Sequence, residues 1–228
     1  MSYPTDAVAI PPAIAAQLPP RDLLREVLAS YIVEIPAGCE LVRAAWNTPS
    51  IWPHAVMRTY RFGPPDSMKT GAGFPFFWIY TAETAYTAVW EAQFCKNPAT
   101  HPGRFVIEAG AENGLIANLS FSQPLQLFDL SGVAASRLGI YDHLRSPDYI
   151  WCQWLGFELD QILAELGGQV HGFIYPSRRH PGARAYAISS HVQSVLARVM
   201  ATKVQQFSEA RIFAELLADP CHIARNLL

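Results

Sequence analysis

Residues 74–91 of this chain read FPFFWIYTAETAYTAVWE. The first part is aromatic and apolar and carries no charge, which predicts a strand over 74–80 that is buried on both faces. Thr81 is a suitable N-cap for a helix over about residues 82–97, with Glu83 in its first turn. The segment therefore predicts a buried strand that leads directly into a helix.

Glu91 stands out within that helix. On a helical projection it falls between Phe94 and Cys95, and most other positions are apolar or aromatic. A helix that is apolar nearly all round is buried, and a carboxylate within it must be paired, hydrogen-bonded or facing a cavity. Two interpretations stay open: an edge glutamate that reaches water, or a functional carboxylate. Tyr80, which ends the strand, is on its own more typical of a core position.

The composition limits the class of protein. The chain has 228 residues, of which half are hydrophobic and 16% are charged, so it is not a disordered chain and can build a sizeable core. A net charge of −2 offers no strongly basic face, and no direct contact with nucleic acid is expected. Eighteen prolines and 14 glycines argue against a helical bundle and favour a loop-rich α+β fold.

The chain divides into three expected segments: an extended arm over 1–20, a folded domain over 21–208 and a helical tail over 209–228. Strands are expected at residues 39–45, 59–62, 104–108, 125–130, 172–175 and 185–189, and helices at 20–32, 151–166 and 210–217.

No secretory leader and no apolar run of membrane-spanning length is seen, so we expect a cytoplasmic protein with no membrane contact. The cysteines are far apart and are expected to be free thiols. No metal-ligand spacing, Walker loop or complete dinucleotide fingerprint occurs, and no metal is expected.

Several polar residues lie in unusual surroundings. Arg43 (in LVRA) and Arg61 (in YRFG) occupy apolar, strand-like contexts, where a guanidinium needs either a protein carboxylate or a ligand phosphate. A basic cluster of three arginines would bind a phosphate or lie in a solvated loop: Arg178, Arg179 and Arg184.

Ser177 lies in YPSRRHPGAR, where a short strand runs into a turn. Its hydroxyl would satisfy backbone groups in that turn, or it would act as a nucleophile with His180. The Gly-x-Ser-x-Gly elbow is absent, which disfavours a serine hydrolase.

Taken in order, these residues resemble the RES domain family, which is named for an Arg, a Glu and a Ser. The similarity covers about residues 39–190. It rests on Arg43 in LVRA, Arg61 in YRFGPP, Tyr80 and Glu91 in YTAETAYTAVWE, and Ser177 in GFIYPSRRHPGARAYAIS.

The resemblance implies a fold and an activity. RES domains resemble the ADP-ribosyltransferase fold, a split pair of small sheets with flanking helices. They are the toxin halves of bacterial toxin–antitoxin pairs. Some degrade NAD⁺ by phosphorolysis or hydrolysis, and others transfer ADP-ribose to a protein. The cognate antitoxin typically carries a helix-turn-helix domain and obstructs the toxin's site. The domain over 21–208 would then bind NAD⁺ as its substrate, without a metal.

The resemblance also assigns roles. Glu91 would stabilise the positive charge that develops on the ribose when the nicotinamide–ribose bond breaks. Arg43 and Arg61 would bind the pyrophosphate, and Tyr80 would stack on the nicotinamide ring. Ser177 would orient nicotinamide, ribose or Glu91 without forming a covalent intermediate.

The acceptor of ADP-ribose separates the remaining hypotheses. Transfer to a protein target is favoured here, because the segments 1–20 and 209–228 extend beyond the matched region and would reach a macromolecule. The alternatives are phosphate or water as the acceptor, a catalytically inactive RES-like binding module, and an unrelated hydrolase that uses Ser177 and His180.

Overall fold

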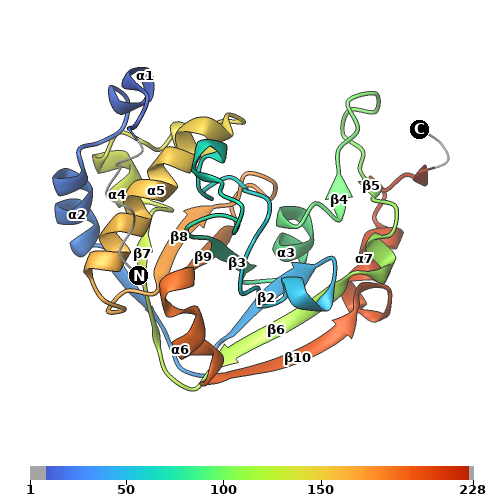
Figure 1. Ribbon diagram of the computed structural model, residues 1–228. Coiled ribbons are helices and arrows are strands. Elements are labelled where there is room, and N and C mark those ends of the chain that lie inside the picture. The colour runs from blue at the N-terminus through green and yellow to red at the C-terminus, as the bar shows by residue number, and fades with distance from the viewer. Residues whose placement is uncertain (1–8, 226–228) are drawn as a thin grey trace.

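The computed structural model describes residues 9–225, and within them eight strands form one curled sheet (Figure 1). The order across the sheet is β1-β7-β8-β9-β3-β2-β6-β10, and neighbours are antiparallel except for the parallel pair β7–β8. The sheet strands are β1 (Ile32–Ile35), β2 (Glu40–Ala45), β3 (Trp78–Ala82), β6 (Leu115–Phe121), β7 (Leu125–Asp129), β8 (Gly172–Pro176), β9 (Arg184–Ser189) and β10 (Met200–Gln206). A separate ribbon pairs β4 (Cys95–Lys96) with β5 (Val106–Ile107).

The helices lie between and beside these strands. They are α1 (Pro12–Ala15), α2 (Arg21–Ala29), α3 (Ala85–Glu91), α4 (Val133–Arg137), α5 (Tyr149–Glu165), α6 (Gln193–Ala197) and α7 (Arg211–Ala218). The mixture of a large sheet and flanking helices agrees with the expected α+β class.

The sheet nearly divides between β2 and β3. β3 pairs with β9 along its whole length, and β2 pairs with β6 along its whole length. β2 and β3, however, pair with each other only at Val42 and Ala82. The expected pair of separate small sheets is therefore wrong in detail, because this single pairing joins the two parts into one sheet.

Three apolar clusters hold the helices on the sheet. On one face of the β1-to-β3 part, α2, α4 and α5 pack over alternate strand residues such as Phe128, Phe173 and Trp78. On the opposite face the intervening residues, including Ile174 and Ile188, pack with α6. A third cluster joins α3 and α7 to β2 and β6. Alternation along each strand thus fills both faces.

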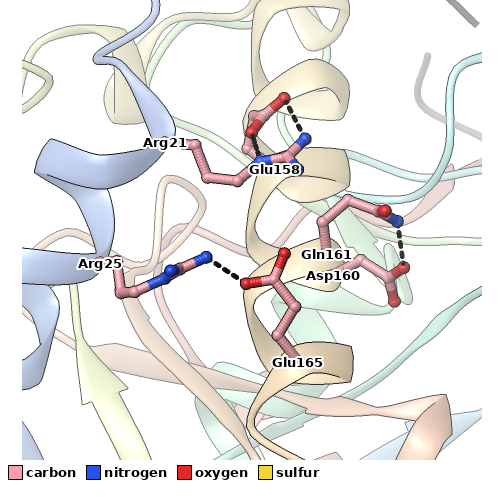
Figure 2. Close-up of polar contacts among 6 residues, drawn as sticks. All are labelled: Arg21, Arg25, Glu158, Asp160, Gln161 and Glu165. Carbon is pink, nitrogen blue, oxygen red and sulfur yellow. Dashed lines mark hydrogen bonds and ion pairs between the residues drawn. The ribbon is translucent and has the colours of Figure 1, made fainter. Parts of the chain in front are cut away.

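Two ion pairs attach α2 to α5, and Figure 2 shows both. Arg21 Nε lies 2.5 Å from Glu158 Oε2, and Arg25 pairs with Glu165. Glu158 is nearly buried, so its charge needs the Arg21 partner. These contacts make α2 part of the folded domain, close to the expected helix over 20–32.

The two terminal segments also pack on the domain. Residues 12–15 form the helical turn α1, and Ile10, Ile14 and Leu18 contact the cluster beneath α5. The expected extended polyproline arm is thus wrong for residues 9–20, and residues 1–8 lie outside the described part. The tail forms α7, as expected, and buries Ile212 and Leu216.

The strand–helix unit around residues 74–91 differs from its prediction in three ways. β3 begins at Trp78 and continues through Ala82, because β9 supplies a pairing partner for each of these residues. The N-cap is therefore Thr84, whose Oγ1 accepts from Thr87 N at 3.2 Å, and Thr81 is a buried strand residue. The helix ends at Glu91 instead of residue 97. Outside this unit, residues 59–62 lie in a loop with a turn at 61–62, where a strand was expected.

None of the helices within residues 9–225 combines the length and the apolar composition that crossing a bilayer requires.

Candidate active site

A cavity of about 410 Å³ opens where β2 and β3 diverge. Its walls come from β2, β3, α3 and the loops that follow β2 and β8. Six basic side chains line it, against one carboxylate, that of Glu91. The basic residues are Arg43, Arg58, Arg61, Lys96, Arg178 and Arg179. This excess of positive charge suits an anionic ligand.

Glu91, the last residue of α3, is held by two hydroxyl groups. Its Oε1 accepts from Ser177 Oγ at 2.6 Å, and its Oε2 accepts from Tyr175 OH at 3.1 Å. Burial and the nearby Glu91 raise the pKa of Tyr175 well above its ordinary value, which keeps the phenol protonated as a donor. Glu91 is thus a hydrogen-bonded carboxylate at the cavity wall.

Ser177 is buried immediately after β8. While its hydroxyl donates to Glu91, its Oγ accepts from His180 N at 3.0 Å. The His180 ring instead bonds Thr87 Oγ1 through Nδ1 at 2.8 Å and packs on Tyr86. Ser177 and His180 therefore do not form a nucleophile–base pair, and the hydrolase alternative has no support in this geometry.

Arg61 is the least satisfied charge in the cavity. It is 7% exposed, and among the described residues its three guanidinium nitrogens have no nitrogen or oxygen partner, with only the weakly bonding Cys152 thiol beside them. Its guanidinium carbon lies 5.1 Å from the Phe62 ring centroid and 5.9 Å from that of Tyr175. Aromatic faces offset only part of the cost of burying a cation, so this group requires an anion.

The backbone next to Arg61 is clamped in place. Phe62 N donates to Tyr80 OH at 3.2 Å, and Trp78 Nε1 donates to Phe62 O at 2.6 Å. Gly156 of α5 lies so close that a Cβ there would be 1.9 Å from Phe62 O. A strand and a helix thus fix the position from which Arg61 enters the cavity.

Arg43 lines the same cavity but already has partners. Its Nε donates to Ser50 O at 2.8 Å and its Nη1 donates to Tyr80 O at 2.6 Å. Burial lowers the pKa of Arg43 to about 10, so the side chain stays cationic at neutral pH. Its partners are two backbone carbonyl groups, one in the turn that follows β2 and one on β3, where the sequence had indicated a carboxylate or a phosphate.

Tyr80 also faces the cavity, with its ring edge-on to Tyr60 at 6.3 Å and to Tyr175 at 6.2 Å. Burial is the main cause that raises the pKa of Tyr80, so its hydroxyl stays protonated and can hold the Phe62 backbone.

The predicted basic cluster separates into two parts. Arg178 and Arg179 line the cavity, and Arg178 lies over the Tyr149 ring at 5.3 Å. Arg184 instead pairs with Glu83 at 2.5 Å, and Glu83 precedes the N-cap Thr84, outside the helix in whose first turn it was expected. Sequence reasoning missed further lining residues, namely Arg58, Lys96, Tyr60, Tyr175 and Gln93. Of these, Tyr175 was detectable, since the strand GFIY places it two residues before Ser177.

The site brings together the five residues that carry the family resemblance: four line the cavity, and Ser177 is hydrogen-bonded to Glu91. Comparison with curated proteins gives no match. A family model of the RES domain matches residues 35–208, which is most of the chain and contains every one of these residues. The chain belongs to the RES domain family.

Proposed function

We propose that this protein is a toxin of a bacterial toxin–antitoxin pair that cleaves the nicotinamide–ribose bond of NAD⁺. The observation that carries the proposal is Arg61, a buried guanidinium without a described nitrogen or oxygen partner that faces a cavity with a single carboxylate. A dinucleotide supplies both groups that such a cavity lacks: a pyrophosphate for the cations and a ribose for Glu91. The near-division of the sheet at β2 and β3 supports an ADP-ribosyltransferase-like fold.

The reaction needs a carboxylate that is already ordered. Bond cleavage leaves positive charge on the ribose carbon and oxygen, and the charge of Glu91 stabilises it. Because Ser177 and Tyr175 donate to its two oxygens, Glu91 needs no reorganisation at that moment. In this proposal Tyr80 stacks on the nicotinamide ring, and Arg61 with Arg178 and Arg179 neutralises the pyrophosphate.

The charge of the cavity helps to decide which group accepts the ADP-ribosyl group. Transfer to a protein was favoured from the sequence because the terminal segments would reach a macromolecule, but residues 10–18 and α7 pack on the domain. Six basic side chains exceed what one pyrophosphate requires. That excess favours inorganic phosphate as the acceptor, with water and a protein side chain as the competing acceptors.

The partner that we propose is a helix-turn-helix antitoxin that covers the cavity mouth. Exposed apolar side chains lie at that mouth, including Trp46 and Tyr60, which would be buried by such a partner.

The test is nicotinamide release from NAD⁺ by the purified chain, wild type beside Glu91→Gln, in buffer alone, with phosphate, and with a cell lysate. We expect release by the wild type only, with a higher rate in phosphate. Release that rises only with lysate would reassign the acceptor to a protein. Absence of release in all three conditions, together with undisturbed bacterial growth on expression, would refute the proposed activity.

A further inference from the structure

Gln93 has a backbone conformation that is unusual for its residue type. Within residues 9–225 it is the only non-glycine residue with a positive φ, at 61°. It occupies the left-handed position that ends α3: Gln93 N donates to Trp90 O at 3.1 Å and Phe94 N donates to Val89 O at 2.9 Å. This pair of bonds is the Schellman motif, in which glycine is the preferred residue at that position.

A glycine would end the helix at this point without strain, so the helix terminus does not explain the glutamine. Residues held in sparsely populated backbone regions concentrate at functional sites, where the side chain is needed in one place. The conformation of Gln93 therefore directs attention to its side chain.

That side chain lines the cavity two residues after Glu91. It is partly buried, and among the described residues its amide makes no hydrogen bond to protein. An amide has one carbonyl acceptor and two N–H donors and carries no charge. Gln93 thus differs in chemistry from the six cations around it, which suit phosphate groups.

We propose that Gln93 recognises the carboxamide group of the nicotinamide and makes the site specific for the amide form of the dinucleotide. This inference rests on the proposed function. Glu91 marks the ribose carbon that carries the nicotinamide ring, and Gln93 lies beside it on the same helix end. A carboxamide also has a carbonyl acceptor and two N–H donors, so the Gln93 amide can pair with it through two reciprocal hydrogen bonds.

The test compares two substrates on three proteins: wild type, Gln93→Gly and Gln93→Asn. The substrates are NAD⁺ and its 3-acetylpyridine analogue, in which a methyl group replaces the NH₂ of the carboxamide. We expect Gln93→Gly to lower kcat/KM for NAD⁺ about ten-fold and to change the value for the analogue much less. Gln93→Asn keeps an amide that tolerates this backbone but is one methylene shorter, and its loss should be intermediate.

Thermal unfolding separates this role from a purely structural one. If Gln93 only stabilised the end of the helix, its replacement by glycine would lower the unfolding temperature. Because glycine removes the strain, Gln93→Gly should unfold at a temperature equal to or above that of the wild type. A lower unfolding temperature, or an equal loss of kcat/KM for both substrates, would overturn the role of Gln93 while leaving NAD⁺ cleavage in place. A wild type that cleaves neither substrate would overturn the proposed function, and the role of Gln93 with it.

Discussion

Ser177 Oγ lies 2.6 Å from Glu91 Oε1, on a β-strand end and a helix end that are 86 residues apart in the chain. Through this bond the serine hydroxyl fixes the direction of the carboxylate. We expect Glu91→Gln to lower NAD⁺ cleavage by at least about 100-fold, because shape is kept while the charge is lost. Affinity for NAD⁺, measured by calorimetry, should change little.

Ser177→Ala should have a smaller effect on the same reaction. It removes one of two donors to Glu91, and Tyr175→Phe removes the other, so each should lower kcat about ten-fold. Ser208→Ala, an exposed serine in the turn before α7, is the matched control and should leave kcat unchanged. Full loss of activity in Ser177→Ala with Tyr175→Phe unaffected would indicate a nucleophilic serine instead.

Arg61→Ala should change ligand affinity and stability in opposite directions. Loss of the guanidinium should weaken NAD⁺ binding by about ten- to 100-fold, because charge-assisted hydrogen bonds to phosphate are lost. The free energy of unfolding without ligand should rise or stay constant, because a buried cation without a described nitrogen or oxygen partner is removed. Calorimetry and urea denaturation measure the two effects. Arg211→Ala, at an exposed ion pair, is the control. Lower stability with unchanged affinity would assign Arg61 to the fold.

Gly156→Ala should destabilise the protein by about 2–3 kcal/mol, because the new Cβ cannot be accommodated against the Phe62 carbonyl. Displacement of Phe62 also moves Arg61, so NAD⁺ affinity should fall as well. Gly71→Ala is the matched control, since a Cβ at Gly71 meets no atom within 4 Å. Equal urea midpoints for the two variants would contradict this account.

We expect His180 to act on the site through Ser177, as a positioning residue. Its backbone N–H bonds the serine hydroxyl, and its ring is held by Thr87 at 2.8 Å. His180→Ala and Thr87→Val break the same contact, so each should lower kcat about ten-fold with little change in KM, and their effects should not add. His180→Asn, whose amide can bond Thr87, should restore part of the rate. Additive losses would show that the two residues act separately.

His191 should give stability a measurable pH dependence. Its Nε2 lies 2.9 Å from Asp160 Oδ1, and the hydrogen bond to Asp160 is the main cause that raises the pKa of His191 above 6.5. A raised folded-state pKa stabilises the protein fully below the unfolded-state pKa, and the contribution is lost as pH rises through the folded-state pKa. The contribution of His191 to the urea midpoint should therefore fall between about pH 6 and pH 8, so the midpoints of the wild type should decrease more over this range than those of His191→Gln. An unchanged slope would exclude His191 as its source.

Much of this architecture could be predicted from local sequence. Strands β2, β7, β8 and β9 and helices α2, α5 and α7 follow from apolar periodicity, and the expected residues Glu91 and Ser177 do meet. β10 was missed because its sequence, MATKVQQ, is polar and exposed at the sheet edge, where only pairing with β6 makes it a strand. Arg58 and Lys96 were missed because their role depends on which loops close over the cavity.

The N-cap of α3 is a second feature that local sequence could not predict. Thr81 and Thr84 are equally good caps by residue type. The choice between them depends on β9, which extends the neighbouring strand through Ala82 and is about 100 residues away in sequence. A long-range pairing therefore decided a local boundary.

The single pairing between Val42 and Ala82 has a mechanical consequence. In a regular sheet the ladder holds adjacent strands about 4.8 Å apart, and no ligand can lie between them. Here the ladder stops after one pair, and the Arg43 side chain on β2 reaches across to the Tyr80 carbonyl of β3. Arg43 therefore acts as a spacer between the two strands beside the cavity that it lines.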